Sequence, residues 1–365
     1  MLIYHTYREL LDRVEQTGRP TRVLGHCPDG SPIICVRSGG DKKPGIVITA
    51  GSHSTEHAGV SAAVELIEKL DTEHEVYVIP TRDPIGLNGY AYALSLGLGK
   101  TPAIETHNEA EAILRESGEV HLDDESLILS LIGDYGYTCS RPGGNGKCAQ
   151  FSAYQRLQEV ERAQPEILAP FRGRRIFMAP RQEGIEGTGD FGRAYTLIIS
   201  PEGEVLHINR FHDTEWAPIE SRCARDLLAE VSPGITFDIH ESQLMGDKYW
   251  LSARHKRNEE DEAWEQKIAH AVIQTIAESG ATLADDIDVL GVPIEETWFT
   301  RTEKGVYWLD AGVRGEGLNF ADFVACNYGL SFGTEMGMYG TFEGRVSLGM
   351  LTVQSAVSVF EERYR

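Results

Sequence analysis

The hydrophobic pattern of the N-terminal part of the chain alternates between strand-like and helix-like segments. Short apolar runs, separated by turn-forming residues, occupy 21–26, 31–38 and 45–51. They predict a β-hairpin that leads into a buried strand. Apolar residues then recur at helical spacing over 59–70, and another apolar run follows at 75–80. This order of strand, helix and strand predicts an α/β fold in which helices cover both faces of the sheet.

The regular alternation is interrupted for about a hundred residues after the turn-rich segment 81–90. Polar helical stretches lie near 105–116 and 151–168, with a glycine-rich break at 143–146 between them. We therefore interpret residues 98–190 as an insertion or subdomain within a single domain of 365 residues.

The second half of the chain resumes the pattern and ends in a helix. Apolar runs and helical spacing predict strands at 204–208, 235–240 and 328–336, and helices at about 217–231, 258–278 and 345–364. Together with the first segments, these elements predict a three-layer α/β/α sandwich with a central, mixed, twisted sheet of about eight strands.

The charge balance excludes several classes of partner. The chain has 34 Lys and Arg residues against 56 Asp and Glu residues, and the resulting formal net charge of −22 repels nucleic-acid backbones and anionic membranes. It contains no run of about 18 apolar residues, and its first residues are too charged for a signal peptide. We therefore expect a cytoplasmic protein that binds neither nucleic acid nor membranes.

The cysteine spacing gives no sign of a disulfide framework. The six cysteines include no close pair, and their density is too low for a disulfide-stapled secreted protein. We expect free thiols in a reducing cytoplasm. Cys139 and Cys148 flank a glycine-rich segment and could close a small loop or half a metal clip, but no second pair of soft ligands accompanies them.

The sharpest local signal for chemistry is the segment GSHSTEHAG at 51–59. His53 and Glu56 stand three residues apart where an apolar strand ends and a helix begins, and in open α/β sheets binding sites form at this end of a strand. Imidazole nitrogen and carboxylate oxygen are suitable zinc donors, and a catalytic zinc takes three protein ligands. A third ligand must therefore come from elsewhere in the chain.

Two histidines are candidates for this third ligand. His57 is adjacent to Glu56, and adjacent side chains point apart. His240 ends the apolar run 235–240 and follows Asp238, which could support the site through a hydrogen bond. We favour His240, although chance HxxE pairs are common and a histidine at a strand end is usually a hydrogen-bonded core residue.

Five segments in the same order resemble the zinc carboxypeptidase family, of which carboxypeptidase A is the familiar member. They are GSHSTEHAG with the strand before it, DPIGLNGY (83–90), HINRF (207–211), TFDIHES (236–242) and SFGTEMG (331–337). The resemblance covers roughly residues 20–97 and 190–365 and leaves the middle segment unmatched. It implies a zinc carboxypeptidase-like fold with one zinc ion per chain.

The resemblance also implies the zinc ligands and the general base. It matches His53, Glu56 and His240 to the three zinc ligands of the family, and Glu335 to its general base. Such a carboxylate takes a proton from a water molecule that zinc has made more acidic and delivers it to the leaving amine. Glu343, on a segment of similar appearance, is the alternative to Glu335.

Three further residues match groups of the family that contact the substrate. Asn209 and Arg210 correspond to the pair that grips the terminal carboxylate of a peptide, a task that suits arginine because its planar fork binds a carboxylate in bidentate fashion. Arg193 lies where the family has an arginine that polarises the scissile carbonyl group. Tyr249 and Tyr307 are both candidates for the mobile tyrosine of the family.

We therefore expect a cytoplasmic zinc hydrolase that removes a C-terminal amino acid from a peptide. Two departures from the family pattern affect substrate register: DPIGLNG replaces the usual Asn-Pro-Asp-Gly, and His212-Asp213 follows HINRF. One alternative is a zinc-dependent deacylase of small N-acyl amino acids, similar to succinylglutamate desuccinylase, so the substrate is a peptide or a small amide. The other alternative is a non-catalytic binding protein on the same scaffold.

Overall fold

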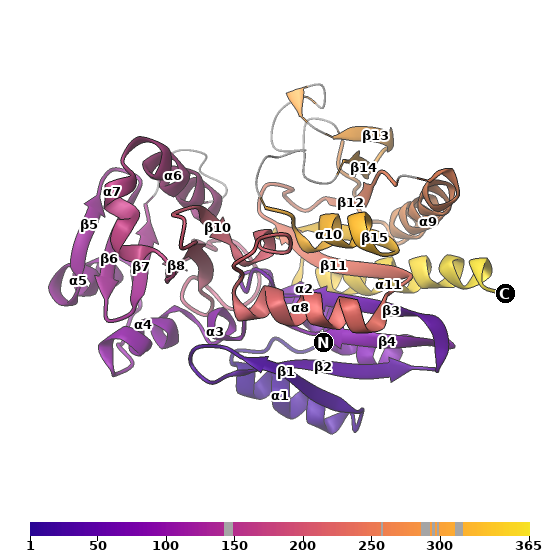
Figure 1. The fold of residues 1–365 in the computed structure, drawn as a ribbon, viewed down its shortest axis with the longest axis horizontal. Coiled ribbons are helices and arrows are strands. Elements are labelled where there is room, and N and C mark those ends of the chain that lie inside the picture. The colour runs from indigo at the N-terminus through magenta and orange to yellow at the C-terminus, as the bar shows by residue number, and fades with distance from the viewer. Residues whose placement is uncertain (142–148, 257, 286–292, 294–295, 298, 311–316) are drawn as a thin grey trace.

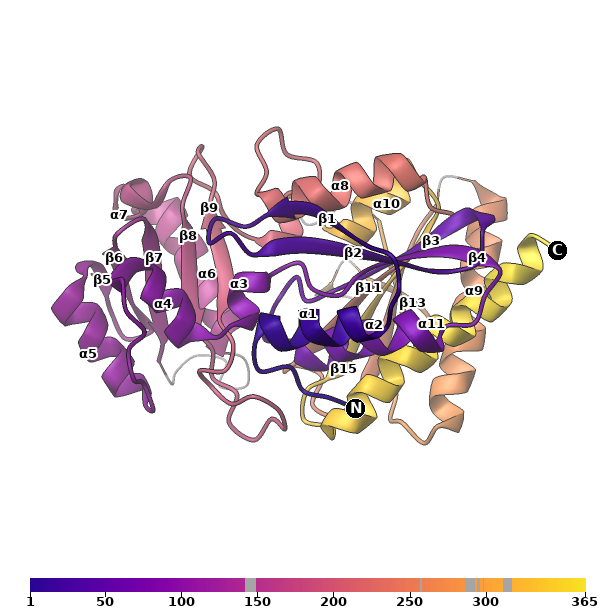
Figure 2. The same ribbon diagram turned by 90° about the horizontal axis from the view of Figure 1, so that it is seen from below.

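The structure is a computed structural model, and it describes residues 1–141, 149–256, 258–285, 293, 296–297, 299–310 and 317–365. Two β-sheets lie side by side (Figures 1 and 2). The larger sheet contains β1 (Thr21–His26), β2 (Pro32–Gly39), β3 (Lys42–Ala50), β4 (His74–Ile79), β11 (Ile235–Ser242), β12 (Tyr249–Arg254), β13 (Thr300–Glu303), β14 (Val306–Leu309) and β15 (Leu330–Gly337).

The nine strands of the larger sheet follow the order β1-β2-β4-β3-β11-β15-β12-β14-β13. The central strands β4, β3, β11 and β15 pair in parallel, whereas the strands at both edges run antiparallel to their neighbours. The predicted hairpin is confirmed, because β1 and β2 pair antiparallel. The sheet is therefore mixed, as the sequence predicts, with nine strands in place of about eight.

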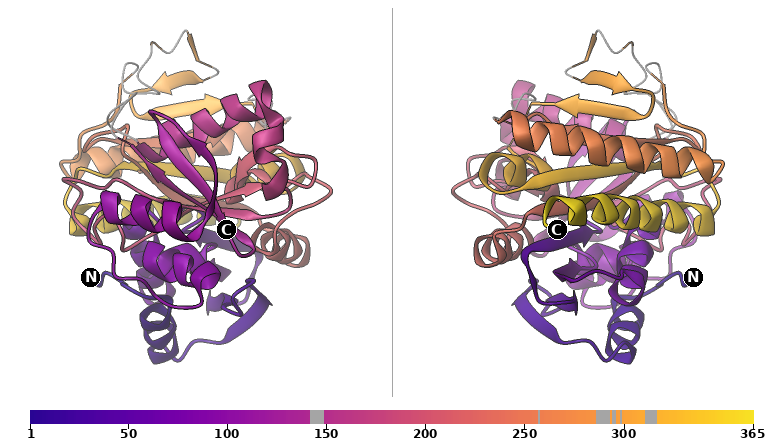
Figure 3. Two further views of the ribbon diagram at one scale, coloured as in Figure 1. Left: turned by 90° about the vertical axis from the view of Figure 1, so that its left-hand side faces the viewer. Right: turned by 90° about the vertical axis from the view of Figure 1, so that its right-hand side faces the viewer.

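Helices cover both faces of the larger sheet (Figures 1 and 3), which confirms the predicted α/β/α layering. One face carries α1 (Tyr7–Gln16), α2 (His57–Lys69), α9 (Glu259–Glu278) and α11 (Phe342–Arg363), and the other carries α8 (Ile219–Val231) and α10 (Phe320–Asn327). The long helices α9 and α11 pack against each other. The side chain of Asn258 caps α9 by accepting a hydrogen bond from the Asp261 amide, and acidic residues fill its first turn, where they interact favourably with the helix dipole.

The alternation of side chains along β11 separates the core from the polar residues. Ile235, Phe237 and Ile239 are at most 1% exposed and belong to the core cluster shared with α2 and α11. Burial of an apolar side chain of this size contributes about 1.5–3 kcal/mol to stability. Successive residues of a strand point to opposite faces, so Asp238 and His240 lie on the other face of the sheet. The pattern that builds the core thus also collects these polar side chains on one side.

The second sheet consists of strands that come between β4 and β11 in the sequence. Its strands are β5 (Glu119–Asp123), β6 (Leu127–Ile132), β7 (Tyr135–Ser140), β8 (Arg175–Ala179), β9 (Tyr195–Ile199) and β10 (Val205–His207), in the order β10-β9-β8-β7-β6-β5. The strands β5 to β8 fall within residues 98–190, the segment interpreted from the sequence as an insertion or subdomain. The sheet also continues past residue 190, where the sequence analysis ended the insertion.

Helices flank this second sheet as well. One face packs on α4 (Tyr90–Leu98) and α5 (His107–Ser117), and the other on α6 (Ala149–Ala163). Short helical turns complete the chain: α3 (Pro84–Leu87), α7 (Pro165–Leu168), η1 (Ala169–Phe171) and η2 (Ile208–Arg210).

Two further expectations bear on the chain as a whole. None of the helices in the described ranges has the length and apolar content to cross a membrane. The five described cysteines are free, four of them buried and Cys326 exposed. Cys148 lies outside the described residues, and with it the loop that it was predicted to close with Cys139.

Candidate functional site

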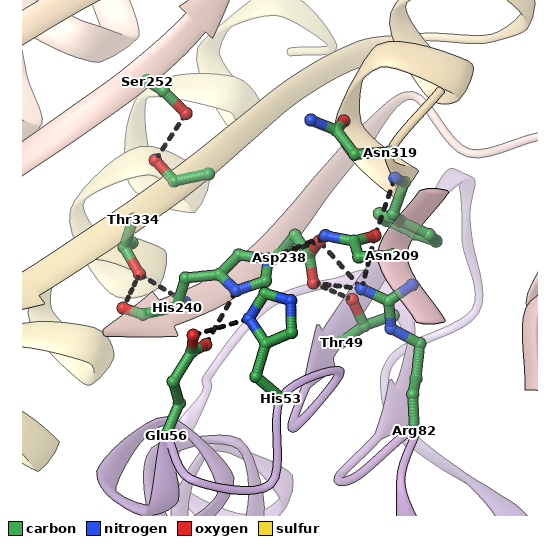
Figure 4. A network of polar contacts seen from close by, with 12 residues as sticks. Thr49, His53, Glu56, Arg82, Asn209, Asp238, His240, Ser252, Asn319 and Thr334 are labelled. Atoms are coloured by element: carbon green, nitrogen blue, oxygen red, sulfur yellow. Dashed lines mark hydrogen bonds and ion pairs between the residues drawn. The ribbon is translucent and has the colours of Figure 1, made fainter. Parts of the chain in front are cut away.

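Three potential metal ligands converge at the end of the larger sheet where β3 and β11 terminate (Figure 4). His53 and Glu56 lie in the turn between β3 and α2, and His240 lies near the end of β11. His53 Nδ1 is 2.6 Å from Glu56 Oε1, and His240 Nδ1 is 2.8 Å from Glu56 Oε2. One ligand atom from each side chain lies within 4.8 Å of the others, so the group can surround a single cation.

The turn that carries two of these residues depends on a close backbone approach. Gly51 has a φ of +58°, and a Cβ atom there would lie 2.5 Å from Thr81 Oγ1 and 2.8 Å from Val60 Cγ2. Glycine adopts such a backbone angle without steric cost. Further along the turn, the Glu56 amide donates to the His53 carbonyl at 3.0 Å, which brings the two side chains to the same side.

A second polar group contacts each imidazole at Nε2, the ring nitrogen that does not face Glu56. His53 Nε2 lies 2.8 Å from His207 Nδ1, and His240 Nε2 lies 2.8 Å from Asp238 Oδ2. A histidine that donates a proton through Nε2 keeps a lone pair on Nδ1, which is how such outer partners orient metal-binding imidazoles. Both Nδ1 atoms face Glu56, so the arrangement presents the donor atoms of all three side chains to one point.

Asp238 is the centre of a buried network behind His240. Its carboxylate accepts hydrogen bonds from Thr49 Oγ1 at 2.7 Å, from Arg82 Nη2 at 2.9 Å to each oxygen, and from Asn209 Nδ2 at 3.0 Å. Arg82 is fully buried, and Asp238 is 1% exposed. Because the two charges offset each other in a water-free setting, the pair can hold His240 firmly without exposing either group to solvent.

Charges in the group keep the carboxylates ionised. Burial opposes the ionisation of Glu56, but the imidazoles of His53 and His240 outweigh it and lower the pKa of Glu56 to about 2. Burial likewise disfavours protonated His240, but the Asp238 and Glu56 carboxylates outweigh it and raise the pKa of His240 well above its usual value. Burial lowers the pKa of His53. The Glu56 carboxylate is therefore ionised and can serve as a ligand for a cation, while the charge of Asp238 is paired with Arg82.

The metal-ligand group opens into a cavity of about 400 Å³, a size typical of small-molecule sites. Glu335 on β15 and Arg210 in η2 also line this cavity. Glu335 pairs with His240 in the parallel register of β11 and β15, so the two side chains project from the same face of the sheet. The structure therefore brings six of the seven predicted site residues to the lining of one cavity: His53, Glu56, Asn209, Arg210, His240 and Glu335.

Solved structures with the same chain topology can now be compared with this one. A protein classed as a carboxypeptidase A from Shewanella denitrificans OS-217 is 12% identical, with a TM-score of 0.52 over 98% of this chain and 70% of that chain. A protein of the same organism that is classed as a metallopeptidase is 14% identical, with a TM-score of 0.51 over 96% of this chain and 88% of that chain. This chain has the metallo-carboxypeptidase fold.

A third structure with this fold has been solved with a small molecule bound. It is a metallo-carboxypeptidase from Pseudomonas aeruginosa in complex with (2-guanidinoethylmercapto)succinic acid, 11% identical, with a TM-score of 0.51 over 98% of this chain and 69% of that chain. No protein-family model matches the present chain, and no curated protein matches its sequence. At these identities the comparison establishes the fold.

Within the metallo-carboxypeptidase fold, Asn209 lines the cavity but uses its amide inside the protein. Its Oδ1 accepts from Arg82 Nη2 and from the Phe320 amide, both at 3.0 Å, and its Nδ2 donates to Asp238. The neighbouring Arg210 is 9% exposed, and its Nη1 donates to the Asn209 carbonyl at 2.9 Å. Asn209 therefore steadies the buried network, while Arg210 lies against the cavity.

Arg193 is the predicted site residue that the structure places elsewhere. It is 1% exposed and does not belong to the cavity lining. Its guanidinium donates to the backbone carbonyls of Tyr4, Leu87 and Gly192, and these hydrogen bonds fix its position. These contacts turn the side chain toward the backbone around α3, so the structure does not bring Arg193 together with the other predicted site residues.

The alternatives left open by the sequence are also placed. The ring nitrogens of His57 lie 3.1 Å from the Thr55 carbonyl oxygen and 3.2 Å from that of Glu186, so the side chain is directed away from the three ligands. Burial lowers the pKa of His57 to about 3, so the ring is neutral and donates to one of the two carbonyls. Glu343 is exposed in the first turn of α11, whereas Glu335 lines the cavity. The candidate tyrosines Tyr249 and Tyr307 are fully buried and lie outside the cavity lining.

Sequence reasoning missed several residues of the site. His207 lies in the segment HINRF and ends the predicted strand 204–208, but no role was assigned to it. Arg82 follows the end of β4, and the tendency of sites to form at the carboxyl ends of parallel strands could have indicated it. Tyr154 lines the cavity from α6 and Tyr195 lines it from the second sheet, and no sequence pattern points to either.

Proposed function

We propose that this protein is a zinc-dependent carboxypeptidase that removes the C-terminal amino acid of a peptide. The observation that carries the proposal is the convergence of His53 Nδ1, the Glu56 carboxylate and His240 Nδ1 on one point beside the cavity. The fold that the chain shares with metallo-carboxypeptidases agrees with it.

The donor set suits a catalytic zinc ion, which takes three nitrogen or oxygen ligands from the protein and keeps a fourth position open. A zinc ion held by His53, Glu56 and His240 would supply Lewis acidity, which makes a water molecule more acidic and polarises an amide carbonyl. The outer partners His207 and Asp238 orient the two imidazoles for this purpose. We expect one ion per chain.

Glu335 is the proposed general base. It lines the cavity on the same face as His240 and is only partly buried, so its carboxylate can meet a water molecule near the ligands. In this role it takes a proton from that water and then delivers it to the nitrogen of the leaving amino acid. A single carboxylate can carry out both transfers because it alternates between its two protonation states.

Arg210 is the proposed anchor for the terminal carboxylate of the substrate. It lines the cavity, and its positive charge is close enough to help lower the pKa of His53. Its Nη1 is fixed by the Asn209 carbonyl, which orients the guanidinium. A planar guanidinium forms charge-assisted hydrogen bonds with a carboxylate, so this residue would select a free C-terminus. Asn209 acts as a positioning residue for both Arg210 and His240.

The general base can be tested with matched variants. Glu335→Gln should leave zinc bound but lower kcat by about 10²–10⁴-fold, measured on a panel of short peptides with metal content determined in parallel. Glu343→Gln is the control, because it makes the same change in an exposed carboxylate of α11. Near-normal turnover by the Glu335→Gln protein would remove Glu335 from the mechanism, and absence of zinc from the unmodified protein would remove the proposed function.

The anchor can be tested with substrates that differ only at the C-terminus. Arg210→Ala should lower kcat/KM for peptides with a free terminal carboxylate far more than for their amides. Equal losses on both substrates would argue against carboxylate capture by Arg210.

A second candidate function is the hydrolysis of small N-acyl amino acids by the same zinc site. It is favoured by the wall that α6 adds to the cavity, where Gln150, Phe151 and Tyr154 belong to the lining. Such a wall favours short substrates over long chains. Hydrolysis of N-acyl amino acids without hydrolysis of dipeptides or longer peptides would decide for this candidate.

A further inference from the structure

One row of residues extends the cavity along the larger sheet, away from the metal-ligand group. β12 pairs antiparallel with β15, with Trp250 opposite Glu335 and Ser252 opposite Gly333. Because alternate residues of a strand share a face, Arg254 continues this row on the face of Glu335. Ser252, Gly333 and Arg254 all line the cavity.

The glycine in this row keeps the space open. A Cβ atom on Gly333 would lie 2.7 Å from Ser252 Oγ, so any larger residue would intrude between β15 and β12. The Ser252 row is two residues beyond the Glu335 row, or about 7 Å along the strand. A single amino-acid side chain can span this distance.

The guanidinium of Arg254 closes the far end of this space. Arg254 is 3% exposed; its Nε donates to Asp322 Oδ1 at 2.5 Å, and its Nη1 donates to Ser252 Oγ at 3.1 Å and to the Ala253 carbonyl at 3.2 Å. The bond to Ser252 turns the guanidinium back toward the metal-ligand group. Its Nη2 makes no hydrogen bond to any residue in the described ranges, yet it is not among the enclosed atoms that lack a partner, so it is open to the cavity.

Asn319 adds a second donor at the same place. Its Oδ1 caps α10 by accepting from the Asp322 amide at 2.7 Å, which fixes the orientation of the side-chain amide. Its Nδ2 has no hydrogen-bond partner within the described part of the chain, and Asn319 also belongs to the cavity lining. The end of the cavity therefore offers two N–H donors, one of them charged.

We propose that this end of the cavity is a subsite for a carboxylate side chain, so that the residue removed is Glu or Asp. The inference rests on the proposed function and names its substrate class. Arg210 would take the main-chain carboxylate of that residue, and Arg254 Nη2 with Asn319 Nδ2 would take the side-chain carboxylate. In an N-acyl derivative of Glu or Asp, Arg210 would likewise bind the main-chain carboxylate, and Arg254 Nη2 with Asn319 Nδ2 would bind the side-chain carboxylate.

Asp322 positions the guanidinium of Arg254. It contacts Nε and lies outside the cavity lining, so it fixes the guanidinium without occupying the nitrogen that faces the cavity. Arg254 is thereby held in place before the substrate arrives, and this preorganisation reduces the entropy lost on binding.

The test compares kcat/KM for paired substrates that end in Glu or Gln, and for N-acetyl-Glu against N-acetyl-Gln. We expect the unmodified protein to prefer Glu by at least tenfold, as for a charge-assisted hydrogen bond in a buried site. Arg254→Gln should bring the Glu/Gln ratio close to one. The ratio is taken within each variant, so a uniform loss of activity does not affect it.

Two further variants separate specificity from structure. Asp322→Asn breaks the same ion pair as Arg254→Gln but keeps the cation and an acceptor for Nε, so it should keep most of the Glu/Gln ratio. Asn319→Asp keeps the helix cap, because Asp caps helices as well as Asn does, but it places a carboxylate at the subsite and should lower the ratio at least tenfold. This variant serves as the test if Arg254→Gln does not fold.

The outcomes distinguish the two proposals. Turnover of the panel without a preference for Glu, or a fall in the ratio for Asp322→Asn equal to that for Arg254→Gln, would overturn the subsite and leave the carboxypeptidase proposal standing. No turnover of any member of the panel by the zinc-loaded protein would overturn the proposed function, and this inference with it.

Discussion

Replacing Asp238 by Asn should destabilise the protein more than the loss of one hydrogen bond explains. In either orientation the new amide keeps one oxygen that can still accept from Arg82 Nη2, which lies 2.9 Å from both carboxylate oxygens. What disappears is the negative charge opposite a guanidinium that is fully buried. Removing one partner of a buried ion pair costs about 3–5 kcal/mol, because the other charge remains unpaired in the interior.

The same substitution should weaken zinc binding. Asp238 Oδ2 accepts from His240 Nε2 at 2.8 Å, and this bond orients the imidazole and makes it more basic. Loss of such an outer partner lowers metal affinity by about 10–100-fold. Urea unfolding in the presence of a chelator would measure the stability term alone, and a competition titration with a zinc indicator would measure the affinity.

Thr49→Val is the matched control for Asp238→Asn. Thr49 Oγ1 donates to Asp238 Oδ1 at 2.7 Å, so the variant removes one hydrogen bond from the same carboxylate while leaving its charge. We expect a loss of about 1 kcal/mol and little change in zinc affinity. If Asp238→Asn lost no more stability than Thr49→Val, the charge pairing between Asp238 and Arg82 would not be what holds this network together.

Three other perturbations give distinct results. Burial raises the pKa of Asp83 to about 7, so between about pH 4 and pH 7 the folded state holds a proton on this carboxyl that the unfolded chain has released. The contribution of this proton to stability is complete below about pH 4. It is lost as the pH rises through 7. Asp83→Asn should therefore gain stability relative to the unmodified protein across this window, by up to about 4 kcal/mol in urea titrations at several pH values, and a constant difference would contradict the raised pKa. Gly51→Ala should lower stability by about 1–3 kcal/mol and also weaken zinc binding, because its Cβ would meet Thr81 and Val60 at the turn before His53; retention of both properties would show that the turn relaxes freely. Adding a chelator to the zinc-loaded protein should lower its Tm. At a free zinc concentration of one hundred times Kd, the free energy of unfolding that is lost is about 2.7 kcal/mol. A Tm independent of zinc would argue against a zinc site in the folded state.

The elements that the sequence predicted well are those with a clear period. The strand β11 begins at the expected residue and α9 begins one residue after it, whereas α2 and α11 begin two and three residues before the predicted positions. Each helix shows apolar residues at helical spacing, and β11 is a compact apolar run. These signals reflect burial of one face, which is the same physical cause that fixes the elements in the fold.

The second sheet could not be read in the same way. β6 (LILSLI), β8 (RIFMA) and β9 (YTLII) are runs of five or six residues that are almost entirely buried. Because both faces of this sheet are covered by helices, its strands show little alternation, and a short apolar run without a period does not distinguish a strand from a buried turn of helix. From the sequence we accordingly predicted the polar helices of this region and the strand at 204–208, but not β5 to β9.

The candidate site divides along similar lines. His53, Glu56 and His240 were found because they end apolar strands, where parallel strands bring their termini together. Arg193 was assigned through the family resemblance, and a matching position along the chain does not fix the direction of a side chain in a loop. The roles of Arg82 and Arg254 depend on which buried carboxylate each meets, and only the packed structure brings those partners together.

The hydrogen bond between His53 and His207 has a consequence for protein engineering. His53 follows β3 of the larger sheet, whereas His207 ends β10 of the second. Shortening α6, which forms one wall of the cavity, should admit bulkier substrates. Deletion of the whole second sheet would instead remove His207, which orients the imidazole of His53. A shortened protein should therefore retain β9 and β10.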